Sequence, residues 1–141
     1  MPETTTYIES SALVAAFMES DRAVRKALRA RGRRVTSAIT LTEAHRAVLR
    51  ARVTERIEAE DERKALVGLR TFARRCDVVA VTDEVLTRAG RPFPVEPIRT
   101  LAAIHMATIE LLDEPPQLVT VVTRDARIAQ NARALGYVVA P

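Results

Sequence analysis

Short β-favouring segments alternate with helical patterns along the whole chain, and this alternation limits the possible folds more than any other feature. The expected strands are residues 4–8, 34–38, 78–81, 118–122 and 137–139. The expected helices are residues 11–17, 21–31, 41–52, 54–75, 83–89, 99–112 and 124–135. Such an order favours parallel strands joined by right-handed crossovers. The sequence therefore predicts an α/β fold, an α/β/α sandwich with a four- to five-stranded parallel sheet.

Two of these elements make sharper predictions about burial. Residues 78–81 are all apolar, which is typical of a strand buried on both faces. Residues 99–112 carry the strongest helical periodicity of the chain. The residues expected on the apolar face of that helix are Leu101, Ile104, Ala107, Thr108 and Leu111.

Length and composition predict a single domain spanning residues 1–141. Apolar residues make up 48% and charged residues 28% of the chain, which excludes an unfolded polar chain. No apolar run reaches the roughly 18 residues that a membrane span needs, and no signal peptide is expected at the N-terminus. Cys76 is the single cysteine and no Cys/His cluster has zinc spacing. We expect a cytoplasmic protein without contact to a membrane.

The positive charge of the chain comes almost entirely from arginine. The net charge is +4, and Lys26 and Lys64 are the only lysines. An excess of arginine is compatible with binding to the phosphates of RNA or DNA. The same usage also arises from genomic base composition, so charge alone leaves nucleic-acid binding open.

Three acids stand where an expected strand gives way to a helix. Glu9 follows the first strand, Glu43 follows the second and Asp125 follows the fourth. Parallel strands end at the same edge of a sheet, which is where open α/β sheets bind ligands. Carboxylates gathered there can hold a hard cation such as Mg²⁺, which activates water and neutralises a phosphodiester.

Each acid also has a purely structural interpretation. Glu43 completes a Thr40-x-x-Glu43 capping box. Asp125 falls in the first helical turn after a Thr123 cap, where negative charge suits the helix dipole. Glu9 ends a strand in solvent, with Ser10 or Ser11 expected as the cap of the next helix. The residues alone leave both interpretations open.

Other catalytic patterns are weaker. His45 and His105 stand apart on separate helices, and we expect them to pack or to form hydrogen bonds. Ser10 and Ser11 lack the His–Asp arrangement of a serine nucleophile. The four glycines are not clustered, which disfavours a glycine-rich phosphate loop.

Four segments resemble those of a known family. They are residues 7–14 (YIESSALV), 37–43 (SAITLTE), 101–108 (LAAIHMAT) and 122–129 (VTRDARIA). In order and spacing they are similar to PIN-domain proteins, and within that family to the VapC toxins of bacterial toxin–antitoxin pairs. The resemblance implies a Mg²⁺- or Mn²⁺-dependent ribonuclease that cleaves RNA, forms a homodimer and is blocked by a VapB-like antitoxin.

The four acids of the family fall, by resemblance, on Glu9, Glu43, Ala102 and Asp125. We therefore take Glu9, Glu43 and Asp125 as the expected catalytic and metal-binding residues, with Thr123 and Ser10 expected to support them or to contact the substrate. Two positions depart from the family pattern, because Glu9 is one methylene longer than the usual Asp and Ala102 carries no ligand atom. Mg²⁺ demands near-ideal octahedral geometry, so we expect a metal affinity lowered by at least about tenfold.

Ala102 leaves three explanations open. The chain is a family member that binds without cutting, a variant deliberately silenced, or an enzyme whose remaining acids hold a metal weakly, with Glu96 or water filling the gap. The alternative function is thus a catalytically inactive PIN-fold module that binds RNA or an antitoxin. A receiver-like phosphoacceptor is disfavoured because Glu9 stands where such a protein needs an Asp.

Overall fold

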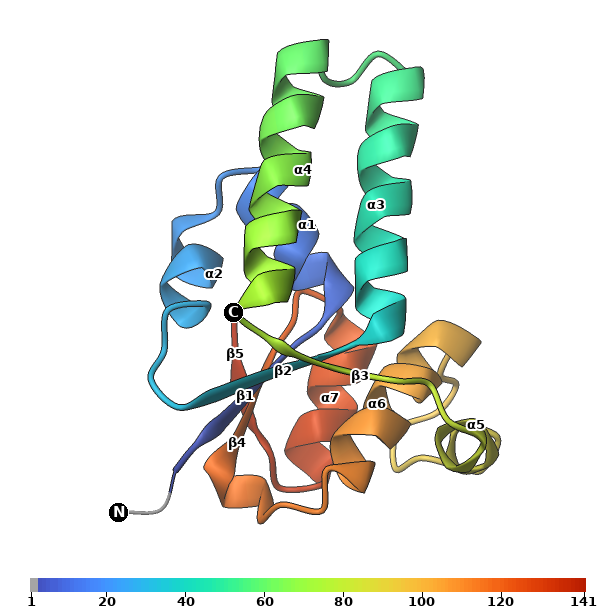
Figure 1. Ribbon diagram of the computed structural model, residues 1–141. Coiled ribbons are helices and arrows are strands. Elements are labelled where there is room, and N and C mark those ends of the chain that lie inside the picture. The colour runs from blue at the N-terminus through green and yellow to red at the C-terminus, as the bar shows by residue number, and fades with distance from the viewer. Residues whose placement is uncertain (1–2) are drawn as a thin grey trace.

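Five parallel strands form one sheet in the computed structural model, which describes residues 3–141 (Figure 1). The strands are β1 (Thr5–Ile8), β2 (Arg33–Ser37), β3 (Asp77–Val79), β4 (Val119–Val122) and β5 (Val138–Ala140). Their order is β3-β2-β1-β4-β5, so β1 lies at the centre. Every neighbouring pair is parallel, and the carboxyl ends of all five strands therefore share one edge. The predicted α/β/α sandwich is confirmed, with five strands.

Helices cover both faces of this sheet (Figure 1). On one face lie α1 (Ser10–Met18), α2 (Arg22–Ala27), α3 (Ala38–Val53) and α4 (Ala59–Arg74). On the other lie α5 (Asp83–Ala89), α6 (Thr100–Leu111) and α7 (Ala126–Ala134). The helices α3 and α4 run side by side and project beyond the sheet. No helix in the described part of the chain has the length and apolar character needed to cross a membrane.

The central strand β1 is buried on both faces. Successive side chains of a strand point to opposite sides, and here Ile8 packs with Leu13 and Leu69 while Tyr7 packs with Met106 on the other side. Both Tyr7 and Ile8 are fully buried. This double anchoring fixes the end of β1, and with it the residue that follows, at the carboxyl edge of the sheet.

Two predictions about burial are wrong. The strand expected at residues 78–81 is Asp77–Val79, and it is an edge strand with Val78 41% exposed. It pairs with β2 alone and lies at the edge of the sheet. The apolar run therefore does not mark a central strand that is buried on both faces. On the predicted apolar face of α6, Leu101 and Leu111 are both exposed, because the buried stretch of the helix runs only from Ala103 to Ile109.

Several helix bounds also differ from the prediction. The helix α3 begins at Ala38, three residues earlier than expected, with Ser37 as its cap. The helix α4 begins at Ala59 instead of residue 54, after a separate turn. The start of α3 matters for the site, because it places Glu43 in the second helical turn.

Candidate active site

The structure brings the three predicted acids to one cleft of about 520 Å³ at the carboxyl edge of the sheet. Glu9 follows β1 directly, Glu43 comes from α3 and Asp125 stands between β4 and α7. The strand order explains this convergence, since β1 lies between β2 and β4. The roles of the three acids stay predictions, whereas their common location is a feature of the fold.

Glu9 is buried, with 4% of its surface exposed, and donors occupy both of its carboxylate oxygens. Oε2 accepts hydrogen bonds from the Ser10 hydroxyl at 2.7 Å and from the Ser11 backbone N–H at 2.9 Å. Oε1 accepts from the Thr123 hydroxyl at 2.6 Å and from the Ser11 hydroxyl. Four donors match the roughly four lone-pair positions of a carboxylate. Glu9 therefore ties the end of β1 to the end of β4.

The same contacts make Glu9 the N-cap of α1. The prediction that Ser10 or Ser11 caps this helix is wrong. Both serines lie inside the helix and turn their hydroxyls back onto Glu9. An acid at the N-cap satisfies a free N–H and places negative charge at the positive end of the helix dipole.

Glu43 is held from the opposite side of the sheet. Its Oε1 lies 2.6 Å from Nε2 of His105 on α6, and Nδ1 of His105 lies 2.8 Å from the Tyr7 hydroxyl. The capping-box interpretation is wrong, because Thr40 lies inside α3 and Glu43 bonds to His105 instead. The expectation that His105 forms a hydrogen bond is confirmed, and its partner is one of the predicted site acids.

Burial sets the protonation of Tyr7. Removal of the phenol from water, and then the Glu9 carboxylate, raise the pKa of Tyr7. The hydroxyl therefore keeps its proton and can donate to His105.

Asp125 is the N-cap of α7. Its Oδ1 accepts from the Ile128 backbone N–H at 2.9 Å, and its own N–H donates to the Thr123 hydroxyl oxygen at 3.0 Å. The expectation that Thr123 caps this helix and that Asp125 lies in its first turn is wrong, because Asp125 itself takes the cap position. One oxygen of Asp125 is thus used by the helix, and the other has no hydrogen-bond partner among the described residues.

Two variants of Asp125 distinguish the contribution of its cap hydrogen bond to stability from the contribution of its negative charge. Asp125→Ala should lower the free energy of unfolding by about 1 kcal/mol, whereas Asp125→Asn should stay within a few tenths, because Asn caps a helix as well as Asp. Urea denaturation measures both values. Equal loss in the two variants would show that the negative charge, and not the cap, stabilises α7.

The fourth family position holds no carboxylate. Ala102 lies three residues before His105, so the two share a face of α6 one turn apart. Its methyl packs against the core cluster that includes Tyr7 and Met106. The position therefore supplies an apolar contact one helical turn before His105.

The cleft carries a strong negative charge although the chain as a whole is positive. Its charged lining residues are Glu9, Glu19, Asp21, Glu43, Asp125 and Arg124. Arg124 is already paired with Asp21. The backbone N–H of Val24, and then Arg124, lower the pKa of Asp21. The remaining carboxylates repel a phosphate group unless a cation neutralises them.

This donor set fits a hard divalent cation in its chemistry. Carboxylate oxygens are the ligands that Mg²⁺ and Mn²⁺ prefer. Within residues 3–141, Oε2 of Glu43 and Oδ2 of Asp125 have no hydrogen-bond partner. No three His, Cys, Asp or Glu side chains of that range are grouped closely enough to hold a metal. Binding of a cation would therefore require the side chains to move, and Glu9 would have to give up one of its hydrogen bonds to take part.

Sequence reasoning missed the partners of the acids. Ser11 is expected only as a cap, yet its hydroxyl also accepts the Arg124 backbone N–H at 2.8 Å and so joins α1 to the β4–α7 loop. Nothing in the sequence connects His105 with Glu43, which lies 62 residues earlier in the chain. The one available indication is the spacing of a single helical turn between His105 and Ala102.

Comparison with known proteins identifies the family of the chain. The family model of the PIN domain matches residues 6–134. The chain is 40% identical over 139 residues to Ribonuclease VapC46 of Mycobacterium tuberculosis H37Rv, and the match covers 96% of each chain.

Two solved structures show the same fold. The VapC20 toxin of Mycobacterium tuberculosis, described as cleaving the sarcin-ricin loop, has a TM-score of 0.68 at 16% identity, covering 96% of this chain and 99% of that one. VapBC2 from Rickettsia felis, bound to a DNA fragment of its promoter, has a TM-score of 0.65 at 12% identity, covering 96% of each. With the family match and the 40% identical relative, the chain belongs to the PIN-domain family and, within it, to the VapC proteins.

Proposed function

We propose that this chain is a ribonuclease, the toxin of a toxin–antitoxin pair, which hydrolyses RNA phosphodiester bonds in the cytoplasm. The observation that supports this most is the convergence of Glu9, Glu43 and Asp125 on one acidic cleft. Membership of the VapC proteins connects that cleft with RNA, since the relative with 40% identity is a ribonuclease.

The three acids have different parts in this proposal. Glu43, held by His105, and Asp125, held by the start of α7, each present one oxygen to the cleft. Glu9 is the most tightly held and would join them by giving up a bond from Ser10 or Ser11. Together they would hold Mg²⁺ or Mn²⁺, which neutralises a phosphate and makes a bound water more acidic. Without a carboxylate at Ala102, we expect weak metal binding and slow cleavage.

A cleavage assay tests this function. Purified protein is incubated with RNA in Mg²⁺ or Mn²⁺, with and without EDTA, beside Glu43→Gln. We expect slow cleavage that EDTA stops and that Glu43→Gln lowers by at least about 100-fold. Glu60→Gln, on the exposed surface of α4, is the matched control and should cleave like the wild type. If Glu43→Gln cleaves RNA at the same rate as the wild type, Glu43 is not a catalytic residue and the active site lies outside this cleft.

The second candidate is a PIN-fold module that binds RNA or an antitoxin without cutting. Ala102 favours it, because the family position that should carry an acid has none. Binding of labelled RNA in the presence of Mn²⁺, with no product after prolonged incubation at high protein concentration, would support this candidate over the ribonuclease.

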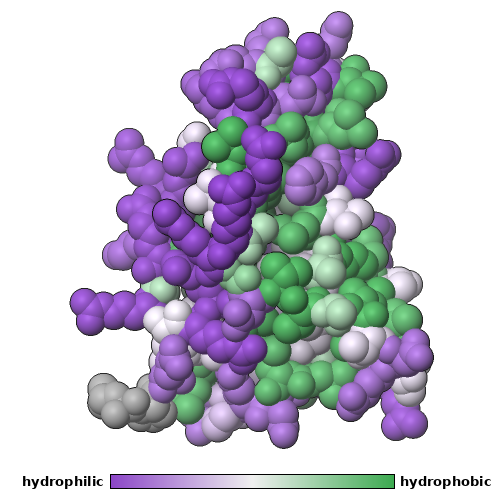
Figure 2. Space-filling model, viewed as in Figure 1, coloured by the Kyte–Doolittle hydropathy of each residue, from purple (hydrophilic) through white to green (hydrophobic). Residues whose placement is uncertain are grey.

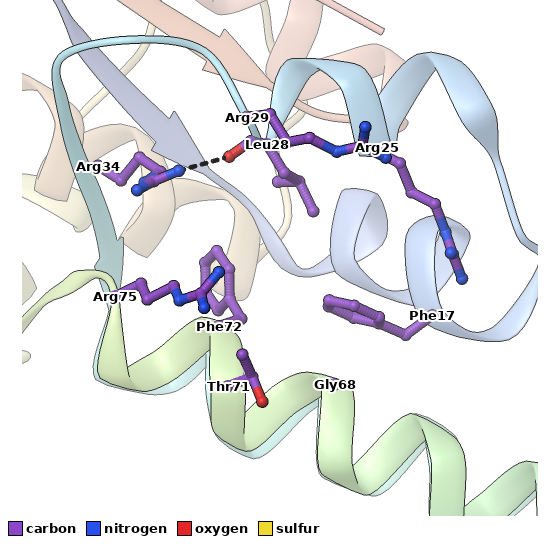
Figure 3. A pocket seen from close by; sticks show the side chains of 9 residues that line it. All are labelled: Phe17, Arg25, Leu28, Arg29, Arg34, Gly68, Thr71, Phe72 and Arg75. Atoms are coloured by element: carbon purple, nitrogen blue, oxygen red, sulfur yellow. Dashed lines mark hydrogen bonds between the residues drawn. The ribbon is translucent and has the colours of Figure 1, made fainter.

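We also propose a docking surface for the antitoxin. A groove of about 330 Å³ between α1, α2 and α4 has an apolar floor and an arginine rim (Figure 3). The floor consists of Phe17, Leu28 and Phe72, and the rim of Arg25, Arg29, Arg34 and Arg75. Such a surface suits a segment with an apolar anchor and acidic neighbours. An antitoxin is the proposed occupant because similar structures were solved as toxin–antitoxin complexes.

Two of these arginines are fixed in place, which favours a preformed rim. Arg25 Nε donates to the Ala16 carbonyl at 2.8 Å, and Arg34 Nη1 donates to the Leu28 carbonyl at 3.0 Å. Arg29→Glu combined with Arg75→Glu should weaken binding of an antitoxin encoded next to this gene by at least about tenfold. Arg70→Glu, on the exposed side of α4, is the control. If all variants bind the antitoxin with the same affinity, the antitoxin binds to another surface.

The exposed apolar side chains of α5 and α6 support the proposed homodimer. Leu86, Leu101 and Leu111 are all exposed on these two helices, which pack together. Figure 2 shows apolar atoms gathered in the region where Figure 1 places β3 and α6. Patches of this kind mark protein interfaces. Light scattering should show a dimer that Leu86→Glu with Leu101→Glu converts to a monomer.

A further inference from the structure

Three side chains, joined by hydrogen bonds, connect the centre of the sheet with the cleft. Tyr7 lies on β1, His105 on α6 and Glu43 on α3, so three separate elements contribute to it. The Tyr7 hydroxyl is 2.8 Å from His105 Nδ1, and His105 Nε2 is 2.6 Å from Glu43 Oε1. Burial decreases from the inside outward, from the fully buried Tyr7 and the 1% exposed His105 to the partly exposed Glu43.

The chemistry of these groups sets the direction of both hydrogen bonds. A neutral imidazole has one donor and one acceptor nitrogen. Glu43 Oε1, a carboxylate oxygen that can only accept, places the proton of a neutral ring on Nε2, and Nδ1 then accepts from the Tyr7 hydroxyl. Of the two neutral tautomers, this one lets His105 donate to Glu43 and accept from Tyr7, which satisfies both nitrogens of the buried ring.

We propose that His105 is a positioning residue that holds Glu43 Oε1 so that Oε2 faces the ligand in the cleft, and that Tyr7 supports this tautomer by donating to Nδ1. The inference rests on the proposed function, because Glu43 is one of its acids. A free Glu side chain samples many rotamers. A carboxylate fixed by a buried imidazole is already in place, and partners of this kind typically change activity by about 10–100-fold.

The fixed ring orientation argues against simple packing. The Tyr7 and His105 rings meet edge to face, with centroids 6.0 Å apart and planes at 73°. This contact leaves both ring nitrogens aimed at polar partners and not at the surrounding apolar residues. An apolar residue of similar size would fill the space equally well, so the polar partners are what distinguish histidine here.

Nitrogen NMR of the His105 ring tests this placement without any need for catalysis. We expect a proton on Nε2 that exchanges slowly with water, and a clear shift of its resonance in Glu43→Gln. Tyr7→Phe, which removes only the hydroxyl, should shift the Nδ1 resonance while Glu43 keeps the proton on Nε2, and only Tyr7→Phe combined with Glu43→Gln should give a mixture of the two neutral tautomers. An Nε2 without a proton, or a resonance that does not respond to Glu43→Gln, would overturn the proposal.

Kinetics provide the second readout. His105→Leu should lower kcat by about 10–100-fold with KM unchanged, and His105→Gln, which keeps a donor, should recover part of the loss. Tyr7→Phe should have no further effect in the Glu43→Gln background. If the wild type does not cleave RNA while the NMR result holds, the proposed function fails and the placement of Glu43 stands. If cleavage occurs and His105→Leu leaves kcat unchanged, the positioning role fails alone.

Discussion

Replacing Ala102 by Asp should raise RNA cleavage in Mn²⁺ by at least about tenfold. Ala102 shares a face of α6 with His105, whose side chain reaches Glu43. A carboxylate at position 102 therefore adds a fourth acid beside the acid that is already held. The gain should appear as a lower Mn²⁺ concentration for half-maximal rate, because the new side chain adds charge and a ligand oxygen.

The matched control is Ala102→Asn, which introduces a side chain of nearly the same size without the charge and should gain little. Stability gives an independent readout. The carboxylate introduced by Ala102→Asp would be partly buried, so the variant should unfold at a lower temperature than the wild type in EDTA and recover in Mn²⁺. An Ala102→Asp protein that neither cleaves faster nor responds to Mn²⁺ would show that the departure from the family pattern extends beyond this position.

Replacing Glu9 by Ala should destabilise the protein by about 3 kcal/mol, or on the order of 10 °C in melting temperature. The change removes the acceptor of four hydrogen bonds and the N-cap of α1. It also leaves the buried hydroxyls of Ser10 and Thr123 without this partner. Glu9→Gln should lower the free energy of unfolding by about half as much. A hydroxyl can turn and accept a hydrogen bond from the new amide N–H, whereas the Ser11 backbone N–H can only donate.

Glu43→Ala is the comparison for this experiment. Glu43 is more exposed and has a single hydrogen-bond partner, so its loss should change stability by less than about 1 kcal/mol. Acids kept purely for activity are often neutral or unfavourable for stability. If Glu9→Ala is as stable as the wild type in urea denaturation, the hydrogen bonds of Glu9 do not stabilise the fold.

The parallel sheet and the common edge of the acids were predictable from sequence, because both depend on the order of elements. An acid close to the junction of a strand with the following helix recurs at Glu9, Glu43 and Asp125, and parallel strands bring such positions together. The edge position of β3 was not predictable in this way. An apolar run of four residues looks the same at the edge and in the middle of a sheet.

The contacts of the acids depend on pairings that periodicity does not encode. Glu43 meets His105 across 62 residues, and Glu9 meets Thr123 across 114. Hydroxyl residues are the expected helix caps, whereas Glu9 and Asp125 themselves take the cap positions. Capping and site formation look like alternatives in the sequence, yet in this fold the same two acids cap helices and line the cleft.

Addition of Mn²⁺ in small steps to ¹⁵N-labelled protein tests most directly whether the three chain segments surround one cation site. Paramagnetic broadening detects weak binding, which is what the missing acid predicts. We expect the amides of residues 9–11, 43–47 and 124–126 to broaden at the same Mn²⁺ concentration and to recover when excess Mg²⁺ is added. Broadening confined to one of these segments, or centred on another surface, would contradict the shared site.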